Sequence, residues 1–239
     1  MSLKNITTYA APLLGATLAF STAIAPAEAG SLKSGEEFGT NGILFTEDTT
    51  VTFEFNQTYG KFQSALRVFQ AGDLNNALAT LFEETKAYDA APDQTQGKAD
   101  DWIGSLGNTV TNQFAQFTFL ANVEYTLGLD SGSDGTVYST SSLNGGTQRT
   151  LFGSHGSISS DDGTTFTNAG DFTSIDPFND PVALGFDDAG NGDDMDYQDM
   201  TLYAQAQRST ASVPEPSLTL GLIGLVAGGW QLRRRRQDA

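Results

Sequence analysis

The chain has 239 residues, contains no cysteine and carries a net charge of −17 at pH 7. A protein this acidic repels nucleic acid and anionic membranes and attracts divalent cations, so DNA or RNA binding is excluded. The lack of cysteine excludes disulfides and thiolate metal sites, so stability must come from packing, supplemented by a bound cation.

Residues 1–29 have the layout of a secretory signal peptide. Lys4 supplies a positive start, an apolar stretch runs from Ala10 to Ala25, and Ala27 and Ala29 form a small-x-small cleavage site. We expect cleavage after Ala29 and export of the rest by the general secretion machinery. The alternative is a buried amino-terminal helix, which the prolines in this stretch disfavour.

The part between this segment and the tail, residues 30–212, has seven basic and 26 acidic residues, a net charge of about −19. About 180 residues are enough for one domain with a real core and too few for two. We predict a single domain over 30–207, followed by a polar linker over 208–212.

Runs of β-branched, aromatic and alternating apolar residues predict the first strands of this domain. These runs are 43–55, 62–69, 74–88 and 113–129. The run 74–88 also fits a helix, but we favour a strand. The run 113–129 is the strongest, and we expect a central strand pair there.

The remaining segments are polar and rich in glycine. A long loop over 89–108 carries Trp102, short strands and turns fill 130–180, and a final strand pair, 182–186 with 200–206, flanks an acidic loop. Short strands, Gly-rich turns and no long amphipathic helix predict an all-β fold. We expect an antiparallel β-sandwich or jelly roll.

The acidic loop is the best candidate for a site, because six aspartates fall within residues 187–199. Gly190 and Gly192 let the backbone fold back, so several hard oxygens can converge on one cation of calcium size. The alternative is a solvated turn with no ion. We predict a calcium site with the ligands Asp188, Asp194, Asp196 and Asp199.

This loop resembles an uncharacterised domain family of bacterial surface proteins, whose signature runs Gly-Phe-Glu-Asp, a Gly-rich gap, then Asp-x-Asp-aromatic-Asn-Asp. The matching residues are 185–188, 190–192 and 194–199. Asp187 replaces the Glu and Gln198 the Asn of the signature, which argues against these two as ligands. Membership implies a β-rich extracellular module without a known reaction.

Other candidate sites are weaker. His155 is the only histidine, which excludes a His-based zinc site, and no Gly-x-Ser-x-Gly motif supports a Ser-His-Asp triad around it. Trp102 is a candidate for stacking on a sugar ring, with a partly buried loop anchor as the alternative. The many carboxylates leave a glycosidase pair open, although any acidic protein offers one by chance.

The tail has three parts in a fixed order. Pro214, Glu215 and Pro216 form a rigid break, and residues 217–232 are almost wholly apolar. The last part is a basic cluster made of Arg233, Arg234, Arg235 and Arg236. A helix from Leu218 to Leu232 is about 22 Å long against a hydrocarbon core of about 30 Å, short for a permanent anchor. The positive-inside rule keeps the arginines cytoplasmic and places the domain on the other side.

This order of parts over 213–239 resembles the PEP-CTERM sorting signal of exported proteins in Gram-negative bacteria, cyanobacteria included. The resemblance implies transient insertion into the inner membrane and recognition by an exosortase, a membrane-embedded transpeptidase-like enzyme. It also implies cleavage near the Pro-Glu-Pro break, followed by release or attachment at the cell surface. The alternative is an ordinary single-span anchor with cytoplasmic arginines.

These features together predict a non-enzymatic, structural or adhesive protein of the cell surface or extracellular matrix, with a calcium-supported β-sandwich. An alternative is a calcium-dependent carbohydrate-binding module that uses the Asp-rich loops and Trp102 to hold extracellular polysaccharide. A polysaccharide hydrolase is the third hypothesis.

Overall fold

The computed structural model describes residues 30–59, 62–85, 106–107, 109–158, 166, 168–188 and 195–209. The predicted signal peptide, the tail, Trp102 and Asp194 lie outside these residues. Strands and short 3-10 turns make up the regular structure of the described part, and none of its helices is long and apolar enough to cross a bilayer.

The strands, in chain order, are β1 (Glu37–Gly39), β2 (Gly42–Leu44), β3 (Thr49–Gln57), β4 (Ala65–Gln70), β5 (Asp73–Glu83), β6 (Phe114–Phe119), β7 (Tyr125–Asp130), β8 (Thr136–Tyr138), β9 (Thr150–Ser154), β10 (Val182–Phe186) and β11 (Met200–Arg208). The 3-10 turns are η2 (Gly132–Asp134), η3 (Ser141–Asn144) and η4 (Ala169–Asp171).

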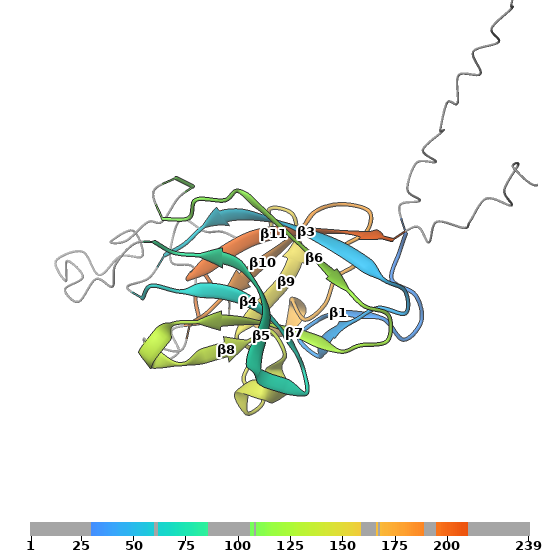
Figure 1. Ribbon diagram of the computed structural model, residues 1–239, viewed down its shortest axis with the longest axis horizontal. Helices are drawn as coiled ribbons and strands as arrows, with labels where there is room; N and C mark the ends of the chain where they lie inside the picture. Colours follow the sequence, from blue (N-terminus) through green and yellow to red (C-terminus); the bar gives the residue numbers. More distant parts are fainter. Residues whose placement is uncertain are drawn as a thin grey trace, which may run out of the picture.

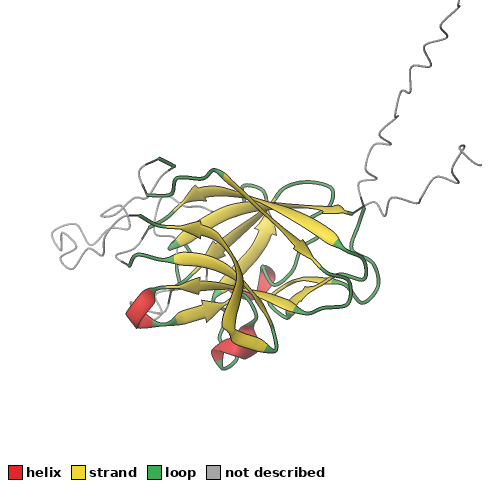
Figure 2. Ribbon diagram, in the orientation of Figure 1, coloured by secondary structure: helices red, strands yellow, loops and turns green. Residues whose placement is uncertain are grey.

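The strands form two antiparallel sheets packed face to face (Figures 1 and 2). The first sheet has the order β1-β2-β7-β4-β5, with β8 also paired to β7, and the second has the order β6-β3-β11-β10-β9. The all-β prediction and its antiparallel β-sandwich are therefore confirmed.

The core lies between the two sheets and is rich in aromatic rings. Along β3, Val51, Phe53 and Phe55 are buried while the residues between them are partly exposed, as the alternation predicts. Edge-to-face ring pairs join the sheets, with Phe38 and Phe152 of β1 and β9 at 5.4 Å between centroids. With no disulfide available, such packing supplies the rigidity of the domain.

The strand predictions are confirmed except for one pairing. The ambiguous run 74–88 contains β5, and the final pair is β10 with β11 in an antiparallel register. The run 113–129 does not form a strand pair, because β6 pairs with β3 in one sheet and β7 pairs with β4 in the other. The segment between them crosses from sheet to sheet through Asn122, whose φ of 60° turns the chain sharply.

The two ends of the described chain meet at one end of the sandwich (Figure 1). The last strand, β11, ends at Arg208, whose guanidinium donates to the carbonyl oxygen of Ser31 at 2.6 Å and to the buried carboxylate of Glu36 at 2.7 Å. Arg208 therefore belongs to the sheet, although the predicted linker begins there. The opposite end of β11 begins at Met200, beside the acidic loop.

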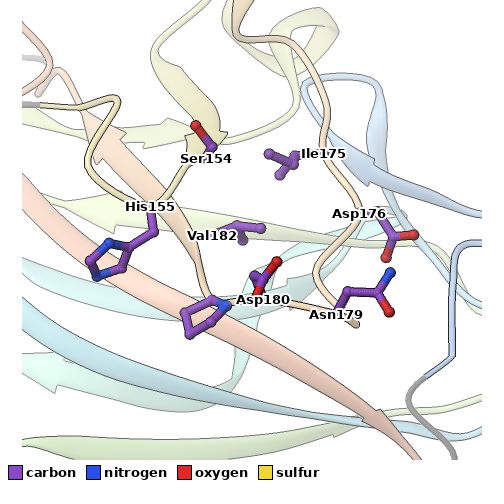
Figure 3. A pocket seen from close by; sticks show the side chains of 8 residues that line it. Ser154, His155, Ile175, Asp176, Asn179, Asp180 and Val182 are labelled. Carbon is purple, nitrogen blue, oxygen red and sulfur yellow. The ribbon is translucent and has the colours of Figure 1, made fainter.

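A cleft of about 570 Å³ opens at the edge of the sandwich beside β9 and β10 (Figure 3). Ile175 and Val182 supply apolar surface, and Ser154, His155 and Asp180 supply polar groups. Its volume falls in the range of small-molecule sites, about 300–1,000 Å³.

Candidate metal centre

The β10–β11 hairpin brings several aspartates of the acidic loop together. Phe186, the last residue of β10, pairs with Met200, the first of β11, so Asp187 and Asp199 lie side by side just beyond the paired strands. Both are buried, with exposed fractions of 0% and 6%, and Asp188 is 2% exposed. Buried carboxylates are rare unless a cation or hydrogen bonds compensate them.

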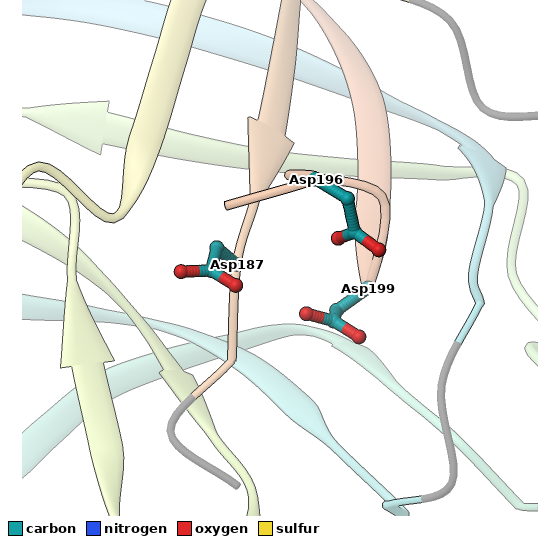
Figure 4. A group of neighbouring side chains, drawn as sticks. All are labelled: Asp187, Asp196 and Asp199. Atoms are coloured by element: carbon teal, nitrogen blue, oxygen red, sulfur yellow. The ribbon is translucent and has the colours of Figure 1, made fainter. Parts of the chain in front are cut away.

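Three of these side chains converge. One carboxylate oxygen from each of Asp187, Asp196 and Asp199 lies within 4.8 Å of the others, and we call this group the acidic trio (Figure 4). Hard carboxylate oxygens at this spacing can hold a metal ion such as calcium or magnesium, which takes oxygen ligands. The donor set is unsuited to a soft metal, which prefers sulfur ligands.

Two of the four predicted ligands belong to the acidic trio. Asp196 and Asp199 belong to it, whereas Asp194 lies outside the described residues. Asp188 contacts the acidic trio through its backbone, because its N–H donates to Oδ2 of Asp199 at 2.7 Å. Asp187 also belongs to the acidic trio, although its departure from the family signature argues against it.

Asp187 is held by an arginine from the neighbouring strand. The Arg149 guanidinium forms an ion pair with Oδ2 of Asp187, and the Asp187 N–H donates to the Arg149 carbonyl oxygen at 3.0 Å. Arg149 directly precedes β9, the strand next to β10. Arg149 is distant in sequence, so no local motif could have revealed this contact.

The backbone of the acidic loop is strained to aim Asp196 inward. Met195 and Tyr197, on either side of it, both have φ of 58°, a left-handed conformation that costs about 1–3 kcal/mol for residues of this size. The Gln198 side chain then donates from Nε2 to Oδ2 of Asp196 at 2.7 Å. Such strain persists only where surrounding contacts enforce it.

Tyr197 supplies those contacts. It is fully buried, its hydroxyl donates to the Gln148 carbonyl oxygen at 3.1 Å, and its ring packs edge-to-face on Phe166 at 6.0 Å. Its carbonyl oxygen lies so close to Gly185 that a Cβ there would approach it to 2.5 Å. The Gly-Phe-Asp-Asp motif thus has a steric reason for beginning with glycine.

The acidic trio has an unfavourable charge balance. Burial raises the pKa of Asp199 well above its usual range, and the charge of Asp188 raises it further. The hydrogen bond from the Asp188 N–H lowers this pKa, whereas the charges of Asp196 and Asp187 raise it. Because the folded state holds this proton more tightly than the unfolded state, the contribution of Asp199 to stability decreases as pH rises above the usual aspartate pKa. A cation held by the acidic trio would offset that penalty.

The other predicted site residues are not part of this cluster. Trp102 lies outside the described residues, as do the signal-cleavage residues Ala27 and Ala29 and the whole sorting tail. His155 is exposed and stacks on Tyr203, with 4.5 Å between ring centroids and 24° between planes. Among the described residues, the only metal-competent group of acidic, His or Cys side chains is the acidic trio.

Comparison with known proteins bears on the tail alone. Residues 212–236 match the family model of the PEP-CTERM protein-sorting motif. No curated protein and no solved structure matches the chain. The matched segment begins close after β11, and it contains the Pro-Glu-Pro break, the apolar run and the arginine cluster. The chain therefore carries a PEP-CTERM sorting signal, which marks it as an exported protein of the exosortase-sorted type.

Proposed function

We propose that this protein is a non-enzymatic structural or adhesive module of the bacterial cell surface or extracellular matrix, stabilised by calcium. The observation that carries the proposal is the combination of a sorting signal with a β-sandwich whose last strand ends just before that signal. A rigid sandwich that needs no disulfides is suited to display outside the cell. Calcium is abundant enough there to occupy a weak site.

The geometry supports a surface-displayed protein whose acidic trio lies at the end away from the membrane. Gly30 and Arg208 lie together, since a Cβ on Gly30 would approach the Arg208 side chain to 3.0 Å. The acidic trio is at the far end of β11, a nine-residue strand. That strand spans about 27 Å at the usual rise per residue. A protein attached through its tail thus presents the acidic trio away from the membrane.

Calcium fits the acidic trio by chemistry and by charge. Asp187, Asp196 and Asp199 offer carboxylate oxygens, and Arg149 is the cation paired with Asp187. Calcium tolerates irregular shells of six to eight oxygens, which backbone carbonyls and water can complete. Burial of the carboxylates gives a cation a strong effect on stability, because it removes repulsion within a low-dielectric site.

Calcium added to the purified chain should raise its thermal unfolding midpoint. Mass action predicts a gain of about 2.7 kcal/mol when free calcium is 100 times its dissociation constant. The measurement is a calorimetric or fluorescence melt at increasing calcium, with chelator as the zero point. A midpoint that stays constant up to millimolar calcium would reject the site.

Two variants sharpen this test. Asp199→Asn should raise the midpoint in chelator, because it removes a carboxyl group whose ionisation the folded state disfavours, while its amide oxygen can still accept the Asp188 N–H. The same variant should lose most of the calcium response. Asp171→Asn is the matched control, since Asp171 is exposed on η4 and should leave both the chelator midpoint and the calcium response unchanged.

Sorting by an exosortase predicts a mature protein that lacks both ends of the translated chain. Mass spectrometry of the protein recovered from its producing bacterium should begin at Gly30 and find no peptide from Arg233 to Arg236. Replacing Glu215 by Ala should leave the tail attached and hold the protein in the inner membrane, whereas Ser217→Ala should not. Recovery of the intact arginine cluster on surface-displayed wild-type protein would show a plain anchor instead.

A further inference from the structure

The outer face of the second sheet is polar but almost uncharged. Along β3, β6 and β11 the inward side chains are apolar, so the residues between them point outward. We call this surface the amide–hydroxyl face after its neutral polar members, which are Thr50, Thr52, Gln116, Thr118, Gln205 and Gln207. Glu54 and the exposed ring of Phe114 lie on the same side, in the row of paired residues that contains Tyr203. Its one carboxylate, that of Glu54, is little charge for a face of a domain whose net charge is about −19.

Some of its hydrogen-bonding groups are occupied by neighbours and others are open. Thr50 and Thr118 share a hydrogen bond of 2.9 Å between their hydroxyls, and Gln116 Nε2 donates to Thr52 Oγ1 at 2.9 Å. The side chains of Gln205 and Gln207 are exposed and form no hydrogen bond with any other described residue. Their amides offer donors and acceptors to a ligand.

An aromatic platform borders this face. Tyr203 precedes Gln205 on the same side of β11, and the exposed ring of His155 lies flat against its ring. The cleft of about 570 Å³ is lined by His155 and by residues 179–182, among others. Figure 3 shows His155, Asn179, Asp180 and Val182 around it. Pro181 directly precedes Val182, whose partner on β11 is Ala204, so the continued register places Pro181, a residue of the cleft wall, opposite Gln205.

The polar groups of the cleft suit hydroxyl groups. The exposed side chains of Asn179 and Asp180 line it together with Ser154, and Ile175 supplies apolar surface for a C–H face. Acceptors and donors in such a mixture recognise a polyhydroxylated, uncharged ligand. An anionic ligand would be repelled by Asp180 and by the charge of the whole domain.

We propose that the cleft and the adjoining amide–hydroxyl face bind a neutral polysaccharide chain. One sugar ring packs against the exposed face of His155, which Tyr203 supports from behind. Its hydroxyls bond to the groups of the cleft, and the following sugars extend over Gln205 and Gln207. The site is separate from the acidic trio, so this binding requires no calcium and goes beyond the structural role proposed above.

Affinity electrophoresis tests the proposal. The full chain, held in detergent micelles, is run through gels that contain a neutral glucan, galactan or mannan, and through a gel that contains the anionic polymer alginate. At least one neutral polymer should retard the protein, in calcium and in chelator alike, and alginate should not. His155→Ala and Gln205→Ala should each weaken retardation, by up to about tenfold in dissociation constant.

Gln70→Ala is the matched control, because Gln70 is an exposed glutamine at the end of β4 in the other sheet. Its retardation should equal that of the wild type, and the melting midpoints of all three variants should stay within a degree or two of it. Absence of retardation in all three neutral gels would overturn the proposal, as would equal retardation of the wild type and both site variants. Retardation that disappears in chelator would place the sugar at the acidic trio instead.

Discussion

Replacing Arg208 by Met should lower the free energy of unfolding by about 3–5 kcal/mol, the loss expected when one partner of a buried ion pair is removed. Arg208 binds both carboxylate oxygens of Glu36, at 2.9 and 2.7 Å, and its guanidinium lies 4.3 Å from the centroid of the Phe178 ring. The side chain of Glu36 is 0% exposed, so the variant leaves a carboxylate in the interior without its charged partner. Denaturant unfolding monitored by fluorescence measures the loss.

The same pair predicts an acid-sensitive stability. Burial acts to raise the pKa of Glu36, but the hydrogen bonds from Arg208 and from Lys33 and Thr46 outweigh it and lower the pKa to about 2 from 4.5. Because this pKa is lower in the folded state, the stabilisation is fully present above pH 4.5 and is lost as pH falls toward 2. The shift corresponds to roughly 3 kcal/mol. In Arg208→Met this loss between pH 4.5 and 2 should be much smaller.

Arg67→Met is the matched control. Arg67 pairs with Asp130 at 2.8 Å, but the two side chains are 34% and 23% exposed. Solvent screens such a pair, so its loss should cost about 1 kcal/mol or less. Equal destabilisation by the two methionine variants would show that Arg208 contributes no more than a surface charge.

Replacing Gly185 by Ala should cost about 3 kcal/mol, at the upper end for an overpacked interior. The new Cβ would lie 2.5 Å from the Tyr197 carbonyl oxygen and 3.0 Å from Cγ2 of Ile158. The first neighbour is backbone, which cannot move without shifting the acidic loop and Asp196. The variant should therefore also weaken the calcium response, as a melt with and without calcium would measure.

Gly72→Ala separates this steric effect from a general preference for glycine. Gly72 lies in the turn between β4 and β5, and no heavy atom comes within 4 Å of a Cβ placed there. Its substitution should change stability by about 0.5 kcal/mol or less, as for most surface positions. If Gly185→Ala behaved like Gly72→Ala, the close approach of Tyr197 would carry no energetic weight.

The strands show how far alternation along a chain can predict a sheet. It located β3 and β4, because a buried face imposes a period of two on each strand separately. The short apolar runs on either side of the acidic loop located β10 and β11, although every residue of β10 is buried and its sequence has no period of two. It could not show that β6 and β7 join different sheets, because a strand looks the same whichever neighbour bonds to it. The pairing depends on long-range packing in the core and on the crossing of the chain at Asn122.

By itself, the sequence determined the sorting signal, the all-β class and the place of the acidic loop. Each depends on the order or spacing of nearby residues. The sorting signal is recognised as a linear segment, so it does not depend on the fold of the domain. Only the tertiary structure decided that Asp187 meets Arg149, that Glu36 receives Arg208, and that His155 lies against Tyr203 at the edge of the cleft. These contacts join residues far apart in the chain, and they arise because sheet register places distant side chains together.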